Sequence, residues 1–161
     1  KMVVEIDQSG RVEDLTMNTT VAYSNGHRKA IFVSAGIKRT VVRILKSNPS
    51  ISVDFAPFFF ALLVFLLLKK EKLKSILIDE EYTGKDTFIT ETLKVLFRKE
   101  GVSGPQIRFG RIGKHSNAHA LALKTHRGKG HGATKIDLEE ILKYIAKKQA
   151  GSKRRTHRVS R

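Results

Sequence analysis

Two histidines of the 161-residue chain, His115 and His119, are four positions apart and would lie on one face of a helix. Imidazoles at this spacing can bind zinc when a third ligand lies nearby. Because the chain contains no cysteine, that ligand would have to be Asp7, Asp79 or His126. No glutamate stands between the two histidines, which excludes the His-Glu-x-x-His motif of metalloproteases. The alternative, which we favour, is that these histidines line a surface that faces phosphate groups.

A phosphate-binding P-loop is a second chemistry to consider, because the sequence contains three Gly-Lys pairs: Gly84-Lys85, Gly113-Lys114 and Gly128-Lys129. None of them has a glycine five residues ahead and a serine or threonine behind, so the motif is excluded. The segment Arg127–Gly132 alternates glycines with basic residues instead. We expect a loop there whose backbone can approach phosphate closely.

The charge of the chain is strongly positive and unevenly distributed. Lys and Arg number 31 and Asp and Glu 15, which gives a formal net charge of +16. Residues 102–136 and 151–161 carry basic side chains and no acidic one. Phosphate binding accounts for this bias, since a carboxylate there would repel the partner. The expected RNA contacts are Arg108, Arg111, Lys114, His115, Lys124, His126, Arg127, Lys129, His131, Lys135, Lys153, Arg154, Arg155, Arg158 and Arg161.

The aromatic residues favour recognition of RNA shape over base stacking. Single-strand binders place exposed rings among basic residues, and here only Phe109 has such neighbours. We therefore expect structured RNA as the partner, first of all ribosomal RNA, with ribosomal proteins as further neighbours. The 14-residue apolar run Phe55–Leu68 is shorter than the roughly 20 residues that span a bilayer. It predicts a buried helix and no membrane partner, and the lack of cysteine fits a cytoplasmic location.

The hydrophobic patterns predict an α/β fold. Strands are expected at Met2–Asp7, Thr19–Tyr23 and Ala30–Ser34, joined by hairpins. Alternating helices and strands follow, which predicts a mixed five-stranded sheet with helices on both faces. The later expected elements are helices at Lys38–Leu45 and Ala56–Lys72, a strand at Ser75–Asp79, a helix at Thr87–Lys99, a strand at Ile107–Ile112, and helices at Ser116–Thr125 and Leu138–Lys148. We expect one domain over residues 1–150 and a basic tail over 151–161.

Three motifs in this order resemble the ribonuclease H-like superfamily, which includes ribonuclease H and the RuvC-type resolvases. The first strand ends in Ile6-Asp7-Gln8-Ser9-Gly10, similar to the family's strand-one aspartate before a small-residue turn. The fourth strand reads Leu77–Tyr82 (LIDEEY), similar to the family's hydrophobic-Asp-x-x-Tyr pattern. Ser116–Ala122 (SNAHALA) resembles the entry to the last motif, where the family has an aspartate before a Leu-Ala pair.

The resemblance implies a particular chemistry. In the family, carboxylates hold two divalent metals that activate water at a phosphodiester. Asp7 and Asp79 match two of these metal ligands, and His119 stands at a third position, so these three are the candidate catalytic residues. The acid that ribonuclease H takes from its first long helix has no counterpart in Ala56–Leu68, and Glu80 and Glu81 only neighbour Asp79.

The site therefore looks one carboxylate short, which favours a fold reused for RNA binding, without catalysis and without a cofactor. The alternative is a nuclease or resolvase that depends on Mg²⁺ or Mn²⁺.

Overall fold

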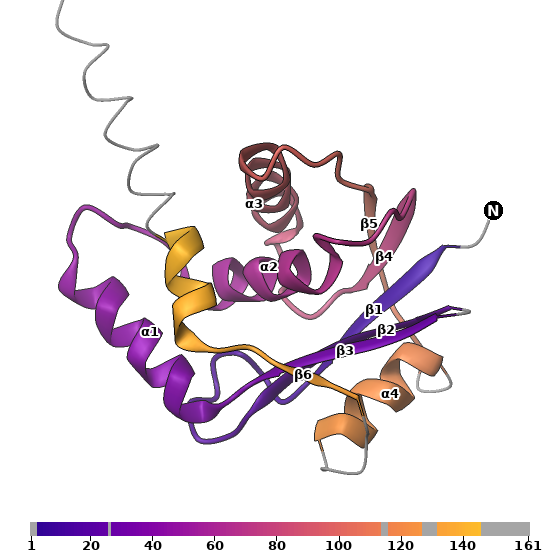
Figure 1. The fold of residues 1–161 in the computed structure, drawn as a ribbon, viewed down its shortest axis with the longest axis horizontal. Helices are drawn as coiled ribbons and strands as arrows, with labels where there is room; N and C mark the ends of the chain where they lie inside the picture. The colour runs from indigo at the N-terminus through magenta and orange to yellow at the C-terminus, as the bar shows by residue number, and fades with distance from the viewer. Residues whose placement is uncertain (1–2, 26, 114–115, 127–131, 146–161) are drawn as a thin grey trace, which may run out of the picture.

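The strands form one mixed sheet in the order β5-β4-β1-β2-β3-β6 (Figure 1). Strands β1 (Val4–Ser9), β2 (Thr19–Asn25) and β3 (His27–Val33) pair antiparallel, whereas β4 (Ser75–Asp79) pairs parallel with β1 and β5 (Gln106–Gly110) parallel with β4. The expected α/β class and mixed sheet are confirmed. The computed structural model describes residues 3–25, 27–113, 116–126 and 132–145.

A sixth strand, β6 (Thr134–Lys135), pairs in parallel with the edge of β3, so the described sheet has six strands and not five. The sequence does not predict it, because two residues beside a glycine-rich segment carry no strand pattern of their own. Its pairing comes from tertiary contact: the Ile136 amide donates to the Phe32 carbonyl at 2.9 Å, and the Ile136 side chain is buried.

Three helices and the helical residues 138–145 lie on one side of the sheet. Helix α1 (Ala35–Ser47) begins after Ser34, whose hydroxyl accepts a hydrogen bond from the Ile37 amide at 3.2 Å. It is longer than the helix expected at Lys38–Leu45. Helices α2 (Phe55–Leu68) and α3 (Asp86–Lys99) follow on either side of β4 in the chain.

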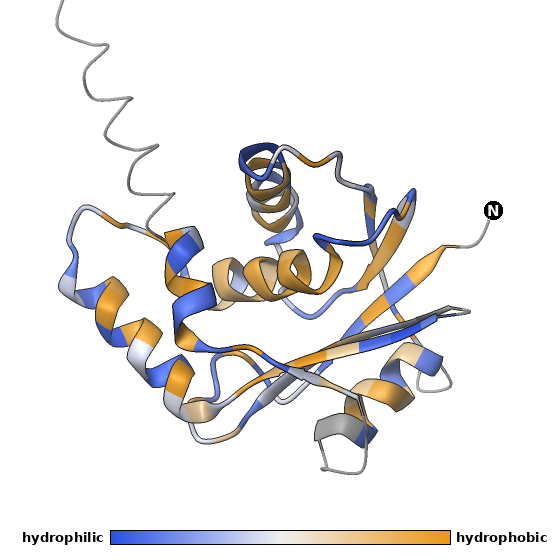
Figure 2. Cartoon of the chain, viewed as in Figure 1, coloured by the Kyte–Doolittle hydropathy of each residue, from blue (hydrophilic) through white to orange (hydrophobic). Residues whose placement is uncertain are grey.

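Helix α2 is the centre of the hydrophobic core. Twelve of its 14 residues are buried, and Figure 2 shows it apolar along its whole length. The ring of Phe65 lies edge-on to Phe97 of α3 at 5.1 Å and to Tyr144 at 5.0 Å between ring centroids. A helix that is apolar on all sides needs such cover from both the sheet and the outer helices. The prediction that Phe55–Leu68 is a core helix is confirmed.

No helix among the described residues combines the length and apolar character needed to cross a bilayer.

Helix α4 (Asn117–His126) packs on the opposite face of the sheet, mainly against β1 and β2 (Figure 1). Small side chains permit this close approach: Ala22 and Ala30 of the sheet meet Ala122 of the helix. Ser116 precedes the helix and accepts a hydrogen bond from the Ala118 amide at 3.1 Å. Helices on both faces, as the sequence predicts, enclose the sheet.

Tyr23 on β2 predicts how the fold responds to alkaline pH. Burial, and then the negative charge of Glu71 that its hydroxyl contacts, raise the pKa of Tyr23 to about 12. Tyrosine in an unfolded chain ionises near pH 10. The contribution of neutral Tyr23 to the free energy of unfolding is therefore fully present below pH 10. As the pH rises toward 12 this contribution is lost, and the loss is roughly 2–3 kcal/mol. Urea unfolding at pH 9 and above pH 11 measures this loss. In Tyr23→Phe the loss should shrink by that amount, and an unchanged pH dependence would contradict it.

Candidate functional site

The sheet register brings Asp7 and Asp79 together. Ile6 of β1 pairs with Ile78 of β4 in parallel strands. Asp7 and Asp79 follow these two residues, and successive side chains of a strand alternate between faces. Both aspartates therefore project to the face opposite the two isoleucines, which is the face that α4 covers. Asp7 is buried at 2% exposure, and Asp79 is half-buried at the end of β4. The resemblance assigns both carboxylates to one metal site, and the structure does place them close together.

Glu81 joins this pair, which corrects the expectation that the site is one carboxylate short. The Glu81 amide donates to the Asp79 carbonyl at 3.1 Å, so the chain turns directly after β4 and keeps Glu81 close to Asp79. Carboxylate oxygens of Asp7, Asp79 and Glu81 all lie within 4.8 Å of one another. We call these three residues the carboxylate cluster. Glu80 is exposed and does not belong to it.

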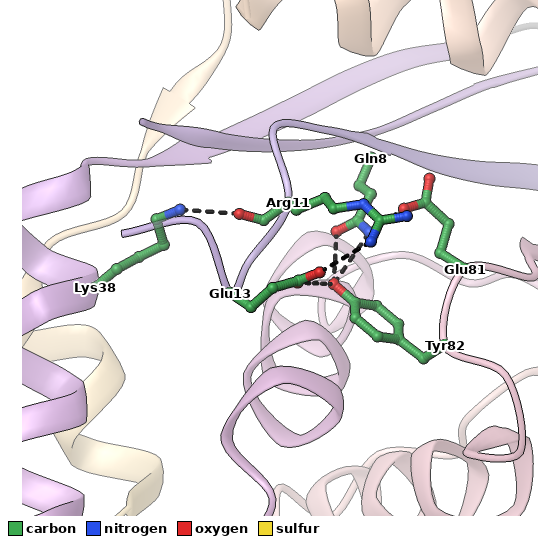
Figure 3. A network of polar contacts seen from close by, with 6 residues as sticks. All are labelled: Gln8, Arg11, Glu13, Lys38, Glu81 and Tyr82. Atoms are coloured by element: carbon green, nitrogen blue, oxygen red, sulfur yellow. Dashed lines mark hydrogen bonds and ion pairs between the residues drawn. The ribbon is translucent and has the colours of Figure 1, made fainter. Parts of the chain in front are cut away.

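Gln8 holds Glu81 in place and was not predicted from the sequence. Its side-chain nitrogen, Nε2, donates to Glu81 Oε2 at 2.6 Å and to the Tyr82 hydroxyl at 3.1 Å (Figure 3). The Tyr82 hydroxyl in turn lies 3.4 Å from Glu13 Oε2. A signal for Gln8 was available: Val4, Ile6 and Gln8 alternate on one face of β1, and all three are buried. A glutamine on such an apolar face needs polar partners.

His119 contacts the carboxylate cluster from α4. Its Nδ1 donates to Asp7 Oδ2 at 2.6 Å, because an ionised carboxylate can only accept. Asp7 Oδ1 accepts from the Gln8 amide at 2.8 Å, and Asp79 Oδ1 accepts from the Ile112 amide at 2.8 Å. These bonds fix the orientation of two carboxylates. The His119 side chain itself stays about one-third exposed.

The electrostatics of the carboxylate cluster favour a cation. The pKa of Asp7 is raised, chiefly by burial and also by the charge of Asp79. The hydrogen bond with His119 lowers it, but by less than burial raises it. Burial likewise raises the pKa of Glu81, with Asp7 and Asp79 adding to the effect. The charge of Asp79 therefore disfavours ionisation of Asp7, and the charges of Asp7 and Asp79 disfavour ionisation of Glu81. A divalent ion would relieve this repulsion, and an all-oxygen donor set suits Mg²⁺ or Mn²⁺.

The β1–β2 loop, residues 10–18, borders the carboxylate cluster and is anchored by Lys38 of α1. Lys38 is fully buried, and its ammonium donates to the Arg11 carbonyl, as Figure 3 shows. It also donates to the Asp14 carbonyl and to the Thr19 hydroxyl. All three ammonium hydrogens thus have acceptors, as a buried charge requires. Arg11 of the same loop is exposed, and its charge partly offsets the rise that burial causes in the pKa of Glu81. By anchoring the loop, Lys38 thus helps to hold the charge of Arg11 near the carboxylate cluster.

Four of the predicted RNA contacts lie among the described side chains, and all four are exposed: Arg108, Arg111, Lys124 and Lys135. Arg108 pairs with Leu77 and so projects to the same face as Asp79. Lys135 pairs with Phe32, and Lys124 lies on α4, so both also lie on the α4 side of the sheet. The remaining predicted contacts lie outside the described side chains, namely Lys114, His115, His126, Arg127, Lys129, His131, Lys153, Arg154, Arg155, Arg158 and Arg161.

The zinc hypothesis and the tail prediction rest on residues outside the described part of the chain. His115 is among those residues, and so is the whole segment 151–161. Among the described residues, the carboxylate cluster is the group whose ligand atoms converge on one point, and His119 instead bonds to one member of it. Comparison of the sequence with protein-family models and with curated proteins finds no match.

Proposed function

We propose that the protein is a nucleic-acid-binding nuclease that depends on a divalent metal, with RNA as its substrate or as one strand of it. The observation that carries this proposal is the convergence of three carboxylates within 4.8 Å in a chain of net charge +16. Carboxylates that are partly buried and this close repel one another, and a bound cation relieves that repulsion. The exposed basic residues on the α4 side of the sheet would bind the phosphates of the substrate.

The residues of the site would have two roles, namely holding the metal and positioning the carboxylates. Asp7, Asp79 and Glu81 would hold the metal, which supplies activation of a water and stabilisation of the leaving oxygen. Gln8 keeps Glu81 turned inward through its 2.6 Å hydrogen bond. His119 orients Asp7 through its contact at Nδ1.

The fold supports the resemblance to the ribonuclease H-like superfamily. The family's parallel pairing of strands one and four occurs here between β1 and β4. One difference concerns the helices: neither α1 nor α2 contains an acidic residue. Glu81 would supply the carboxylate that the family takes from a helix.

Cleavage assays test the proposal. The protein is incubated with labelled RNA hairpin, RNA–DNA hybrid and branched DNA, in Mg²⁺, in Mn²⁺ and in EDTA. We expect cleavage of at least one substrate in metal, none in EDTA, and loss of activity in Asp79→Asn. The asparagine keeps the oxygen that accepts from the Ile112 amide, so the fold should persist. Cleavage that persists in Asp79→Asn or in EDTA would refute the proposal.

A second candidate is binding to structured RNA, first of all ribosomal RNA, without catalysis. The observation that favours it is the size of the charge surplus, which exceeds what a single phosphodiester at the carboxylate cluster requires. RNA binding that is tight, unaffected by metal and free of cleavage on every substrate would establish this candidate over the first.

A further inference from the structure

The chain has a third basic region, which lies in the first half of the sequence. Residues 15–53 contain six lysines and arginines and no aspartate or glutamate, and this is the longest acid-free stretch in the chain. Two of the six, Arg28 and Lys29, lie on β3, and Lys38 is buried. The other three are Arg39, Arg43 and Lys46, all on α1 and all exposed.

These three cations form a row on the outer side of α1. At 3.6 residues per turn, Arg39, Arg43 and Lys46 fall within an arc of about 60° and span about 10 Å along the helix axis. The buried residues Lys38 and Val41 lie on the other side of the helix. Among the described residues none of the three cations forms an ion pair with a carboxylate. Their charges are therefore directed to solvent without local neutralisation.

The row begins at the β1–β2 loop, which borders the proposed metal site. Arg39 donates to the Leu15 carbonyl of the β1–β2 loop at 2.7 Å, and its neighbour Lys38 binds the Arg11 carbonyl of the same loop. The loop in turn reaches the carboxylate cluster through Glu13 and Tyr82 (Figure 3). Positive charge thus continues from Arg11 beside the cluster, across the loop, and along α1.

We propose that Arg39, Arg43 and Lys46 bind the phosphate backbone of the nucleic acid on the far side of the β1–β2 loop from the carboxylate cluster. This inference rests on the proposed function. A polyanion fits because phosphates recur every few ångströms along a strand, so a row about 10 Å long meets two or three of them. An acidic protein patch would need only scattered cations, whereas a row with a single direction matches a linear backbone. The contact gives the substrate a fixed path across the protein.

The test compares two double variants that remove the same charge. Arg43→Gln with Lys46→Gln removes two cations from the row on α1. The matched control, Lys94→Gln with Arg98→Gln, removes one lysine and one arginine from exposed positions of α3. Binding of a fluorescently labelled RNA hairpin is followed by anisotropy in EDTA between about 50 mM and 200 mM KCl.

We expect the α1 variant to bind more weakly and the slope of log K against log salt to fall by about two, one for each phosphate that no longer meets a cation. The α3 control should keep at least most of the wild-type slope. Equal slopes in both variants would overturn the inference and leave the proposed function standing. Failure of the wild-type protein to bind RNA would overturn the proposed function itself. Unchanged RNA binding with weaker adsorption to phosphatidylserine vesicles would assign α1 to a membrane surface and refute the inference.

Discussion

Replacing Asp7 with asparagine is expected to stabilise the metal-free protein and to abolish metal-dependent cleavage. The side chain is 2% exposed and its pKa is raised, chiefly by burial, so the folded state disfavours its negative charge. The neutral amide removes that unfavourable charge, and its oxygen still accepts from the Gln8 amide. Its nitrogen donates to His119 Nδ1 when the imidazole takes its other neutral tautomer. The expected gain is about 0.5–2 kcal/mol in the free energy of unfolding, measured in urea with EDTA present.

The same substitution removes a negative charge from the proposed metal site. Loss of a metal that stabilises the transition state by about 4 kcal/mol lowers the rate about a thousandfold. The opposite signs of the two effects make the prediction specific, because a change at a merely structural residue would lower stability and activity together. A destabilised Asp7→Asn protein, or one that cleaves at the wild-type rate, would contradict the assigned role of Asp7.

Replacing Lys38 with methionine is expected to destabilise the protein by about 2–4 kcal/mol. Methionine fills a similar volume but leaves the carbonyls of Arg11 and Asp14 and the Thr19 hydroxyl without their donor. Removing a buried charge offsets part of this loss, since burial lowers the pKa of Lys38 and disfavours the charged form. The net effect is a loss, because the acceptors stay in place. Urea unfolding at neutral pH measures it.

Lys46→Met on the same helix is the matched control, because Lys46 is exposed and its replacement should change stability by less than about 0.5 kcal/mol. The β1–β2 loop should also loosen in Lys38→Met, so amide hydrogens of residues 10–18 should exchange faster with solvent. Unchanged exchange in these residues would show that Lys38 does not anchor the loop.

Local patterns were sufficient to predict several elements, and the family resemblance implied that Asp7 and Asp79 lie close together. The strand at Ser75–Asp79 has the predicted bounds, because a short apolar run there is enclosed by polar residues on both sides. The resemblance implied parallel pairing of the first and fourth strands, and this pairing, which the structure contains, brings the two aspartates together. Helix α4 also begins where Ser116 predicts, because the capping hydroxyl is a local signal.

Other features depend on contacts between segments far apart in the chain. Glu81 turns toward Asp7 because of a backbone turn after β4, and Gln8 then holds it from β1. Strand β6 exists only through its pairing with β3. Lys38 lies in a helix with other basic residues, and nothing in its immediate sequence distinguishes the buried lysine from the exposed ones. Such distinctions arise from packing, which local periodicity does not encode.

The position of a bound Mn²⁺ ion tests the central claim most directly. Anomalous scattering from crystals grown with MnCl₂ locates the metal independently of any activity. We predict a peak between the carboxylates of Asp7, Asp79 and Glu81 in the wild-type protein, and no peak there in Asp79→Asn. Wild-type crystals with manganese only elsewhere, or with no manganese at this position at saturating concentration, would contradict the assignment of a metal-dependent nuclease.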